Sequence, residues 1–163
     1  MDLFKHWKEI VDVIGTGQRS SFHCSIATVD DRGVPNVTPI GTVFLRDDHS
    51  GYFFDTFTSK LAENVESNQN ICLMAVNTNT SFWLKSFFKG KFLAPPGVRL
   101  YGTVGQLRKA TEEEIAAINK RIKPMSWLKG SKLIWSDFTH VRDIQFNDFR
   151  PVQYPKMMEH LWQ

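Results

Sequence analysis

Hydrophobic residues near the N-terminus recur at the three- and four-residue spacing of an amphipathic helix. They are Leu3, Phe4, Trp7, Ile10, Val11 and Ile14. This spacing predicts a helix whose apolar face packs on the core of the protein. Gly15 and Gly17 follow directly, and we expect them to end the helix.

The pattern then changes to short runs that are typical of β-strands. Residues 22–29, 34–45 and 52–54 are rich in β-branched and aromatic side chains, and turns rich in Asp and Gly separate them. Pro35 and Pro39 cannot donate hydrogen bonds to a neighbouring strand, so the second run is expected at a sheet edge or a bulge. Three strands joined by tight turns predict an antiparallel meander.

Helical and strand patterns follow one another in the rest of the chain. Helices are expected at 59–67 and at 111–123, the second of which begins with a Thr-x-x-Glu capping box. Strands are expected at 71–76, 98–108 and 139–152. About six strands thus come mostly in neighbouring pairs, and two or three helices stand between them. This order predicts a mainly β (α+β) protein, an antiparallel barrel with helices at its ends.

Composition narrows the class of protein. The chain has 163 residues, 42% hydrophobic and 23% charged, which fits one globular domain. No apolar run approaches the length of a membrane span and the N-terminus is not a signal peptide, so we expect a cytoplasmic protein without membrane contact. The net charge of +3 is too small to predict nucleic-acid binding, but it suits an anionic cofactor.

The cysteine and histidine residues indicate neither a disulfide nor a metal site. Cys24 and Cys72 both lie in apolar runs, so two buried free thiols are expected. The five histidines show none of the spacings that bind metal.

The segment 77–97 has no clear period and is expected to be irregular. Between Phe82 and Phe92 it interleaves aromatic side chains with lysines. Long irregular segments in small domains are often functional. The segment could act as a lid, a dimer contact or a membrane-touching loop, or it could simply fold onto the barrel.

The stretch 52–66 is the most informative for function. A strand ends, a turn rich in hydroxyl groups follows, and a helix begins. A helix N-terminus offers free N–H groups and a partial positive charge, Thr56, Thr58 and Ser59 add hydroxyl donors, and Lys60 adds a full charge. This combination suits a phosphate group. It is also explained by a plain N-cap, in which Ser59 or Thr58 satisfies its own helix.

The sequence ATVDDRGVPNVTPIGTVFL, followed by YFFDTFTSKLAENVESNQNICLMAV, resembles the FMN-binding split β-barrel family related to pyridoxamine 5′-phosphate oxidase. The resemblance covers residues 20–107 well and extends more loosely to about residue 152. It implies a single FMN-binding domain over 1–163, an antiparallel split β-barrel of about six strands with flanking helices. It also implies a homodimer with FMN at the subunit interface.

The resemblance implies two groups of cofactor-binding residues. The strand that passes along the flavin ring, largely through backbone groups, corresponds to Pro39, Ile40, Gly41, Thr42 and Val43. The turn that holds the ribityl chain and phosphate corresponds to Asp55, Thr56, Phe57, Thr58, Ser59 and Lys60. Many members carry a second basic residue in this turn, where this chain has Leu61. A basic residue at the start of the ring-contacting strand is also common in the oxidase, and this chain has Pro39 or Ile40 there. Arg99, or an Arg of the partner subunit, is expected to compensate. Ser126 and Trp127 correspond to partner-subunit contacts.

These features favour an FMN-dependent oxidoreductase with a small-molecule substrate and NAD(P)H or another reduced carrier as donor. The tail does not reproduce the Arg-rich segment with which the oxidase grips its substrate, so pyridoxamine phosphate is not the expected substrate. One alternative is a split barrel without turnover, or one that binds haem or a deazaflavin, with His23 or His140 as axial ligand. A nucleic-acid-binding barrel is disfavoured, because the aromatic and basic residues concentrate in one segment.

Overall fold

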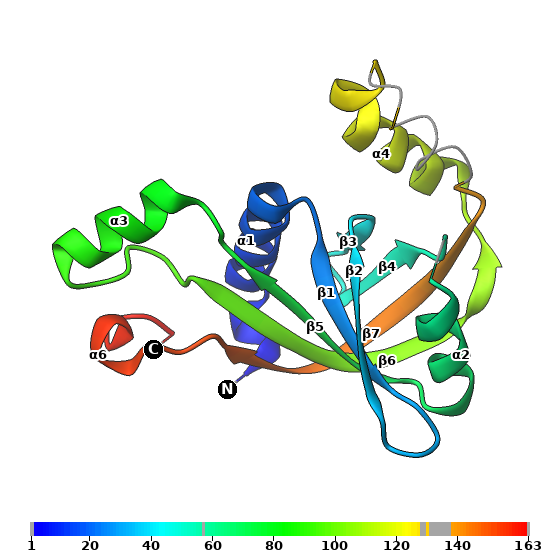
Figure 1. The fold of residues 1–163 in the computed structure, drawn as a ribbon, viewed down its shortest axis with the longest axis horizontal. Helices are drawn as coiled ribbons and strands as arrows, with labels where there is room; N and C mark the ends of the chain where they lie inside the picture. Colours follow the sequence, from blue (N-terminus) through cyan, green and yellow to red (C-terminus); the bar gives the residue numbers. More distant parts are fainter. Residues whose placement is uncertain (1, 57, 128–129, 131–137, 163) are drawn as a thin grey trace.

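Strands that are far apart in the sequence join into one antiparallel sheet that curls into a half-barrel (Figure 1). The computed structural model describes residues 2–56, 58–127, 130 and 138–162. Within these residues the sheet has seven strands in the order β2-β1-β5-β6-β7-β4-β3. Their bounds are β1 Cys24–Val29, β2 Pro35–Ile40, β3 Val43–Leu45, β4 Ser50–Phe54, β5 Asn70–Val76, β6 Gly97–Lys109 and β7 His140–Pro151. The predicted split β-barrel with flanking helices is therefore confirmed.

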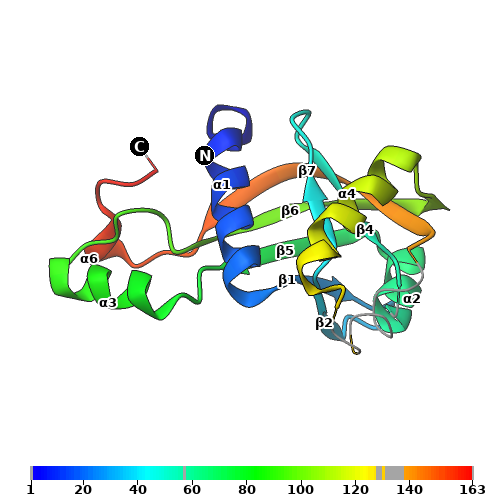
Figure 2. The same cartoon turned by 90° about the horizontal axis from the view of Figure 1, so that it is seen from above.

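Helices surround this sheet. They are α1 Leu3–Ser21, α2 Ser59–Ser67, α3 Thr80–Lys89, α4 Glu112–Ile122 and the short α6 Pro155–Met158, with a 3₁₀ turn at Lys123–Met125. Helix α1 lies across the sheet and packs mainly on β5 and β6 (Figure 2). The main core lies between them and contains the fully buried Ile10, Phe53, Leu73 and Leu100. Each such side chain contributes roughly 1.5–3 kcal/mol by leaving water.

Helix α1 is longer than the sequence pattern predicted. It does not end at Gly15 and Gly17 but continues to Ser21. At Gly17 an added Cβ atom would lie 2.9 Å from the Cβ atom of Ala75 and 3.0 Å from the backbone nitrogen of Val76. Gly17 therefore lets the helix approach strand β5 closely, and its role is packing rather than termination.

The predicted strand 34–45 is two strands, which is why the sheet has one strand more than expected. Residues Gly41 and Thr42 separate β2 from β3, and these two strands are the opposite edges of the sheet. The chain thus passes from one edge to the other at this link. The edge position that Pro35 and Pro39 predicted is confirmed for β2.

The segment 77–97 is not irregular, because ten of its residues form helix α3. Asn79 caps its N-terminus by accepting from the backbone N–H groups of Ser81 and Phe82, and Gly90 ends it with a φ of 64°. We call α3, the segment 90–96 and α6 the arm, which extends from one end of the barrel (Figure 1). An aromatic cluster holds the arm together: Phe82, Trp83, Phe92 and Tyr154.

The two cysteines are free thiols, as predicted, but their surroundings differ. Cys24 is fully buried, whereas Cys72 is only partly covered. Burial raises the pKa of the Cys24 thiol to about 12. No helix among the described residues is both long and apolar enough to cross a membrane.

Candidate functional site

The 55–60 turn connects β4 to α2 and is anchored by a buried ion pair. The Nε atom of Arg142, on β7, donates to Oδ2 of Asp55 at 2.6 Å, and both side chains are more than 90% buried. The hydroxyl of Thr58 donates to the other oxygen of Asp55. Thr58 is the N-cap of α2, yet its side chain caps no backbone N–H of that helix. In the described part of the chain, the first turn of α2 is therefore open to an external acceptor.

Arg142 was missed by sequence analysis, and it holds the whole α2 segment. Besides Asp55, it donates to Glu66 at 2.8 Å near the C-terminus of α2 and to the Gly105 carbonyl at 3.4 Å. Burial alone would lower the pKa of Arg142, but the hydrogen bonds to Asp55 and Glu66 raise it above its ordinary value. An arginine inside a strand pattern was the only signal available in the sequence.

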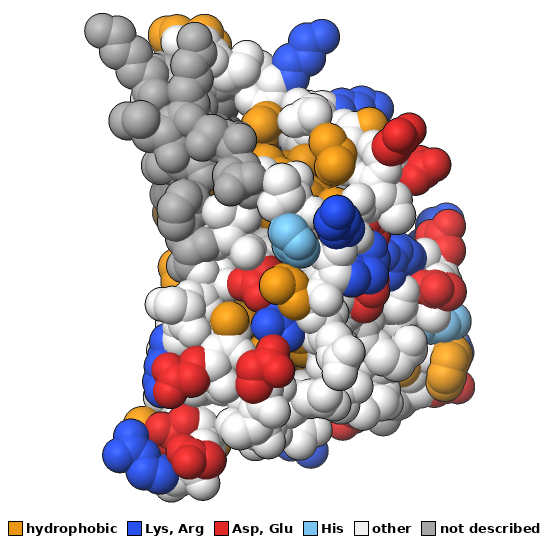
Figure 3. All heavy atoms as spheres, turned by 90° about the vertical axis from the view of Figure 1, so that its right-hand side faces the viewer, with side chains coloured by type: hydrophobic (Ala, Val, Ile, Leu, Met, Phe, Trp, Pro, Cys, Tyr) orange, Lys and Arg blue, Asp and Glu red, His pale blue; other side chains and the backbone are white. Residues whose placement is uncertain are grey.

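The remaining residues of the turn lie near the surface. Ser59 and Lys60 are exposed at the start of α2, and the Lys60 ammonium lies 3.1 Å from a carboxylate oxygen of Glu63. Thr56 is partly buried. Phe57 lies outside the described residues. Figure 3 views this end of the molecule and shows acidic and basic side chains interspersed over it.

The link between β2 and β3 contains the residues predicted to follow the flavin ring. Ile40 and Val43 point into the core and are almost fully buried. The carbonyl oxygens of Gly41 and Val43 accept from Gln18 at 3.0 and 3.3 Å and from Arg121 at 3.3 and 2.6 Å. These contacts fix the path of the link. With the side chains of Ile40 and Val43 turned inward, those two residues can meet a ligand only through their backbone.

Thr42 joins the link to the turn. Its hydroxyl lies 3.3 Å from both the backbone nitrogen and the carbonyl oxygen of Phe54, the residue before Asp55. The structure therefore brings the two predicted groups of cofactor residues, 39–43 and 55–60, together at one end of the barrel.

A hollow of about 800 Å³ opens beside this link. It lies between the end of α1, the link and α4, and most of its walls are apolar, as at Phe22, Phe44 and Ile118. Arg121 lines it as well, with its guanidinium carbon 3.5 Å from the centre of the Phe44 ring. Burial lowers the pKa of Arg121. Arg19 and Lys120 add positive charge, and no carboxylate is among the lining residues. The hollow thus suits a planar group with negative charge.

Arg99 lies far from the turn in the same chain. It pairs with Met74 on β5 and lines a second hollow of about 720 Å³ at the base of the arm, together with residues 148–154. The turn lies near the opposite end of β6. The backbone N–H of Asp55 donates to the His140 carbonyl, and His140 pairs with Lys109 at the end of β6. Ten residues of β6 separate Lys109 from Arg99, roughly 30 Å along the strand.

Ser126 and Trp127 follow α4 directly. The Ser126 hydroxyl donates to the Lys123 carbonyl, and the Trp127 ring nitrogen donates to the carbonyl of Pro124, which lines the larger hollow. Trp127 is 79% exposed. Both residues therefore lie beside the hollow and contact only their own helix end among the described residues.

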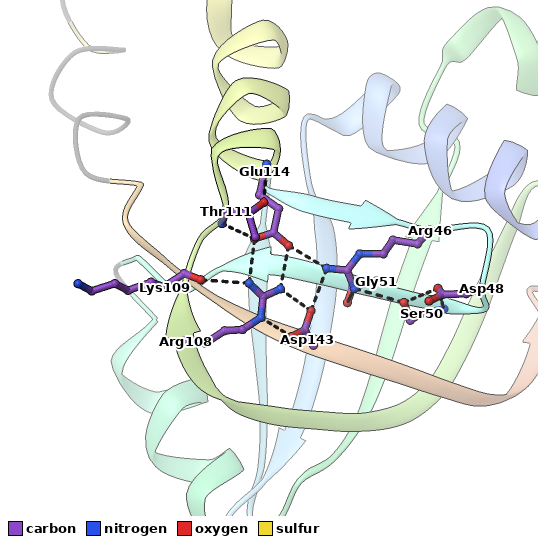
Figure 4. A network of polar contacts seen from close by, with 9 residues as sticks. All are labelled: Arg46, Asp48, Ser50, Gly51, Arg108, Lys109, Thr111, Glu114 and Asp143. Atoms are coloured by element: carbon purple, nitrogen blue, oxygen red, sulfur yellow. Dashed lines mark hydrogen bonds and ion pairs between the residues drawn. The ribbon is translucent and has the colours of Figure 1, made fainter.

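A second group of charges, also missed by sequence analysis, stabilises this end of the barrel (Figure 4). Arg46 contacts Glu114 at 2.8 Å and Asp143 at 2.9 Å, and Arg108 contacts the same two carboxylates. Arg108, followed by Arg46, holds the pKa of Asp143 and of Glu114 below their usual values. Because each charge is paired, this network ties α4 to β6 and β7 and is structural.

The two histidines considered as axial ligands show no clear ligand geometry. The Nδ1 atom of His23 is buried without a hydrogen-bond partner in the described part of the chain. The Nδ1 atom of His140 lies 2.9 Å from the hydroxyl of Thr139. Metal-binding histidines usually donate their second N–H to a carboxylate or a carbonyl, and neither ring makes such a bond to any residue that the structure describes.

Comparisons with known proteins agree on the fold. An FMN-binding protein from Syntrophomonas wolfei has a similar structure, with a TM-score of 0.64 and 13% sequence identity. The alignment covers 92% of this chain and 90% of that chain. HutZ, the haem storage protein from Vibrio cholerae, gives a TM-score of 0.54 at 16% identity and covers 87% of this chain and 94% of its own. An F420 reductase gives 0.51 at 16% identity, with coverage of 78% and 88%. No curated protein matches the chain.

The same architecture thus occurs in proteins with three kinds of cofactor, so these likenesses support the fold and not the ligand. The family comparison is more specific. The family model of pyridoxamine 5′-phosphate oxidase matches residues 9–145, which include most of α1, the link, the 55–60 turn, all of β6 and the first half of β7. The chain belongs to the pyridoxamine 5′-phosphate oxidase family.

Proposed function

We propose that this protein is a homodimeric FMN-binding flavoprotein of oxidoreductase type, with the FMN phosphate at the N-terminus of α2. The observation that carries the proposal is the direction of the Thr58 hydroxyl. It donates to Asp55 and leaves the first turn of α2 without a side-chain cap. No acidic residue lies in that turn, and Lys60 adds a positive charge. Uncapped helix N-termini bind phosphate through their N–H groups and their dipole.

The carboxylate of Asp55 would repel a phosphate if its charge were not compensated. Arg142 contacts it at 2.6 Å within a buried pair, so the two charges largely cancel. Asp55 can therefore orient Thr58 without opposing the ligand. Arg142 thereby neutralises Asp55 from β7, and Lys60 is the cationic residue of the turn that would meet the phosphate.

The flavin ring would lie along the 39–43 segment, beside the larger hollow. That hollow has the apolar walls and the positive charge that a flavin with its anionic tail requires. Bound FMN would supply transfer of hydride or electrons. Gln18 and Arg121 would keep the link rigid by holding its carbonyl groups, and the Thr42 hydroxyl would hold the link to the turn.

No histidine or carboxylate is among the residues that line this hollow. We therefore propose a reaction that needs no proton transfer by a side chain of the hollow, apart from its arginine and lysine groups. It would join a reduced carrier such as NAD(P)H to a small-molecule acceptor. Dimers are common in the family, which supports a homodimer with FMN at the interface.

The visible spectrum of the purified protein tests the proposal. We expect flavin absorption in the protein as isolated, or quenching of FMN fluorescence when FMN is added to colourless protein. Added NADH should then bleach the flavin bands. A colourless protein that takes up no FMN contradicts the proposal, and so does a haem or deazaflavin spectrum. If the protein binds FMN but no reduced carrier bleaches the flavin bands, the binding site stands and the proposed oxidoreductase activity is contradicted.

A further inference from the structure

Helix α1 ends at Phe22 in a conformation that is unusual for a bulky residue. Its φ of 65° and ψ of 4° lie in the left-handed region, where glycine usually ends a helix. Helix α3 ends in the same region with Gly90, at a φ of 64°. The Phe22 side chain is also 71% exposed. Residues that combine a strained backbone with an exposed apolar ring are typical of ligand sites.

Phe22 lies at the larger hollow, between the end of α1, the link and α4. The link packs against its backbone, because an added Cβ atom at Gly41 would lie 3.0 Å from the Phe22 carbonyl oxygen. The other aromatic residue of the hollow, Phe44, already stacks on Tyr52 at 5.0 Å and on the Arg121 guanidinium at 3.5 Å. The Phe22 ring stacks on no aromatic ring in the described part of the chain. Of the two rings, Phe22 is the one left for a ligand.

Arg121 offers a ligand an open hydrogen-bonding edge. Its guanidinium is held by the Phe44 ring, and its Nη1 atom donates to the carbonyl groups of Gly41 and Val43. The Nε and Nη2 atoms make no hydrogen bond to any residue that the structure describes. Two N–H groups on one side of a guanidinium match the two oxygens of a carboxylate. An edge that is held in place but unpaired therefore suits a carboxylate.

The charges around the hollow also favour an anion. Arg19 lies in the last turn of α1, and Lys120 and Arg121 lie in the last turn of α4, so part of their charge compensates two helix dipoles. Two helix C-termini together carry about −1 charge, against three full positive charges. None of the three cations forms an ion pair with a carboxylate of the described residues. The hollow therefore keeps an excess of positive charge.

We propose that Phe22 and Arg121 clamp the small-molecule substrate in this hollow, and that the substrate is a planar aromatic ring with a carboxylate. Phe22 stacks on the ring, Arg121 binds the carboxylate through Nε and Nη2, and Arg19 and Lys120 add positive charge. The inference rests on the proposed function, in which the FMN phosphate takes the N-terminus of α2 and leaves the cations of the hollow to a second anion. It adds the class of substrate and the residues that select it.

Calorimetric titration with 2-naphthoate and with its neutral amide tests the role of the carboxylate. The wild type should bind 2-naphthoate at least about tenfold more tightly than 2-naphthamide. Arg121→Gln should bring this ratio close to one, whereas a purely structural role of Arg121 would leave the ratio unchanged. Equal affinity of the wild type for the two compounds, or a ratio that Arg121→Gln leaves intact, overturns the inference.

Phe22→Gly separates a role in stacking from a role in packing. Glycine adopts a φ of 65° without strain, so the melting temperature should stay the same or rise. The affinity for 2-naphthoate should fall at least about tenfold, because the stacking ring is lost. Phe4→Ala is the matched control, because Phe4 is 70% exposed at the other end of α1, and it should keep the wild-type affinity. Wild-type affinity in Phe22→Gly, or a joint loss of stability and affinity, overturns the inference.

The proposed function and this inference fail in different ways. With FMN bound, 2-naphthoate should shift the flavin absorption bands without releasing FMN. If 2-naphthoate competes with FMN, the flavin ring itself fills the hollow and the inference is overturned. If the wild type binds no FMN but binds 2-naphthoate with the expected preference over the amide, the proposed function fails and the clamp stands. If it binds FMN and no 2-naphthoate, only the clamp fails.

Discussion

Helices α2 and α4 both have a threonine as N-cap residue, but their N-termini are built in opposite ways. At α4 the Thr111 hydroxyl accepts from the Glu114 backbone at 3.2 Å, and the Glu114 carboxylate accepts from the Thr111 backbone at 2.9 Å. Three glutamates fill its first turn. At α2 the hydroxyl of Thr58 donates to Asp55 instead, and no acid lies in the first turn.

The difference is between an N-terminus that its own side chains cap and one that they leave uncapped. Helix α4 satisfies its own N–H groups and uses Glu114 a second time, in the ion-pair network with Arg46 and Arg108. Helix α2 is anchored by Arg142, and its first turn, which no side chain caps among the described residues, is where we propose that an external anion binds. A helix that is held in place by contacts elsewhere does not need a side-chain cap, so the N–H groups of its first turn can be left available to a ligand.

Of the substitutions that test this difference between α2 and α4, removal of Arg142 should lower the free energy of unfolding most. Arg142→Ala leaves the buried Asp55 without its partner, which costs about 3–5 kcal/mol of unfolding free energy. Chemical denaturation measures the change. Arg150→Ala on the same strand is the control, because Arg150 is exposed and should lose less than about 1 kcal/mol. A loss for Arg142→Ala as small as that of the control would show that the ion pair does not anchor α2.

Removal of Lys60 should weaken the cofactor without weakening the fold. A charged hydrogen bond to phosphate is worth about 1.5–3 kcal/mol, so Lys60→Ala should lower FMN affinity about 10- to 100-fold. Fluorescence titration measures the affinity. Lys8→Ala, an exposed lysine on α1, keeps the wild-type value. Wild-type affinity in Lys60→Ala would mean that the phosphate binds elsewhere.

Removal of the Thr111 cap of α4 should lower stability and leave FMN affinity unchanged, the opposite of the effect expected for Lys60→Ala. Thr111→Ala breaks the capping box of α4 and should cost about 1 kcal/mol of stability. FMN affinity should not change, because α4 contributes no N–H group to the turn. Denaturation and FMN titration on the same sample check both points. A loss of FMN affinity with unchanged stability would reverse the roles assigned to the two helices.

Acid should affect the α4 network gradually. Arg108 lowers the pKa of Asp143 and Glu114 in the folded protein below their usual values of 3.8 and 4.5. The folded state therefore binds protons more weakly than the unfolded state. The stability from this network is present above pH 4.5 and is lost as the pH falls through the lowered values. Melting temperatures between pH 6 and 3 should fall less steeply in Arg108→Gln, and equal slopes would contradict this account.

The sequence predicted the fold well where periodicity and turn chemistry agreed. The strands 22–29, 71–76 and 98–108, helix α2 and the capping box of α4 are confirmed within one or two residues. Gly17 was interpreted as a helix end, because a glycine used for close packing looks the same in sequence as one that terminates a helix. The N-cap Asn79 and the C-cap Gly90 could have predicted α3, but its aromatic residues showed no clear amphipathic period.

The site was predictable only in its local part. The turn could be placed by its strand-to-helix position, and the 39–43 segment by family resemblance. Arg142 could not be placed, since it lies 87 residues from Asp55 in the chain and only the curled sheet brings them together. The open cap of α2 depends on that contact. For the same reason, the sequence alone could not decide between a plain cap and a phosphate site.

The ratio between riboflavin and FMN dissociation constants tests the central claim most directly, because riboflavin lacks only the phosphate. The account predicts that the wild type binds FMN at least about 100-fold more tightly than riboflavin, and that Lys60→Ala lowers this ratio while riboflavin affinity stays unchanged. Equal affinity for the two flavins, or a ratio that Lys60→Ala leaves intact, would contradict phosphate binding at the N-terminus of α2.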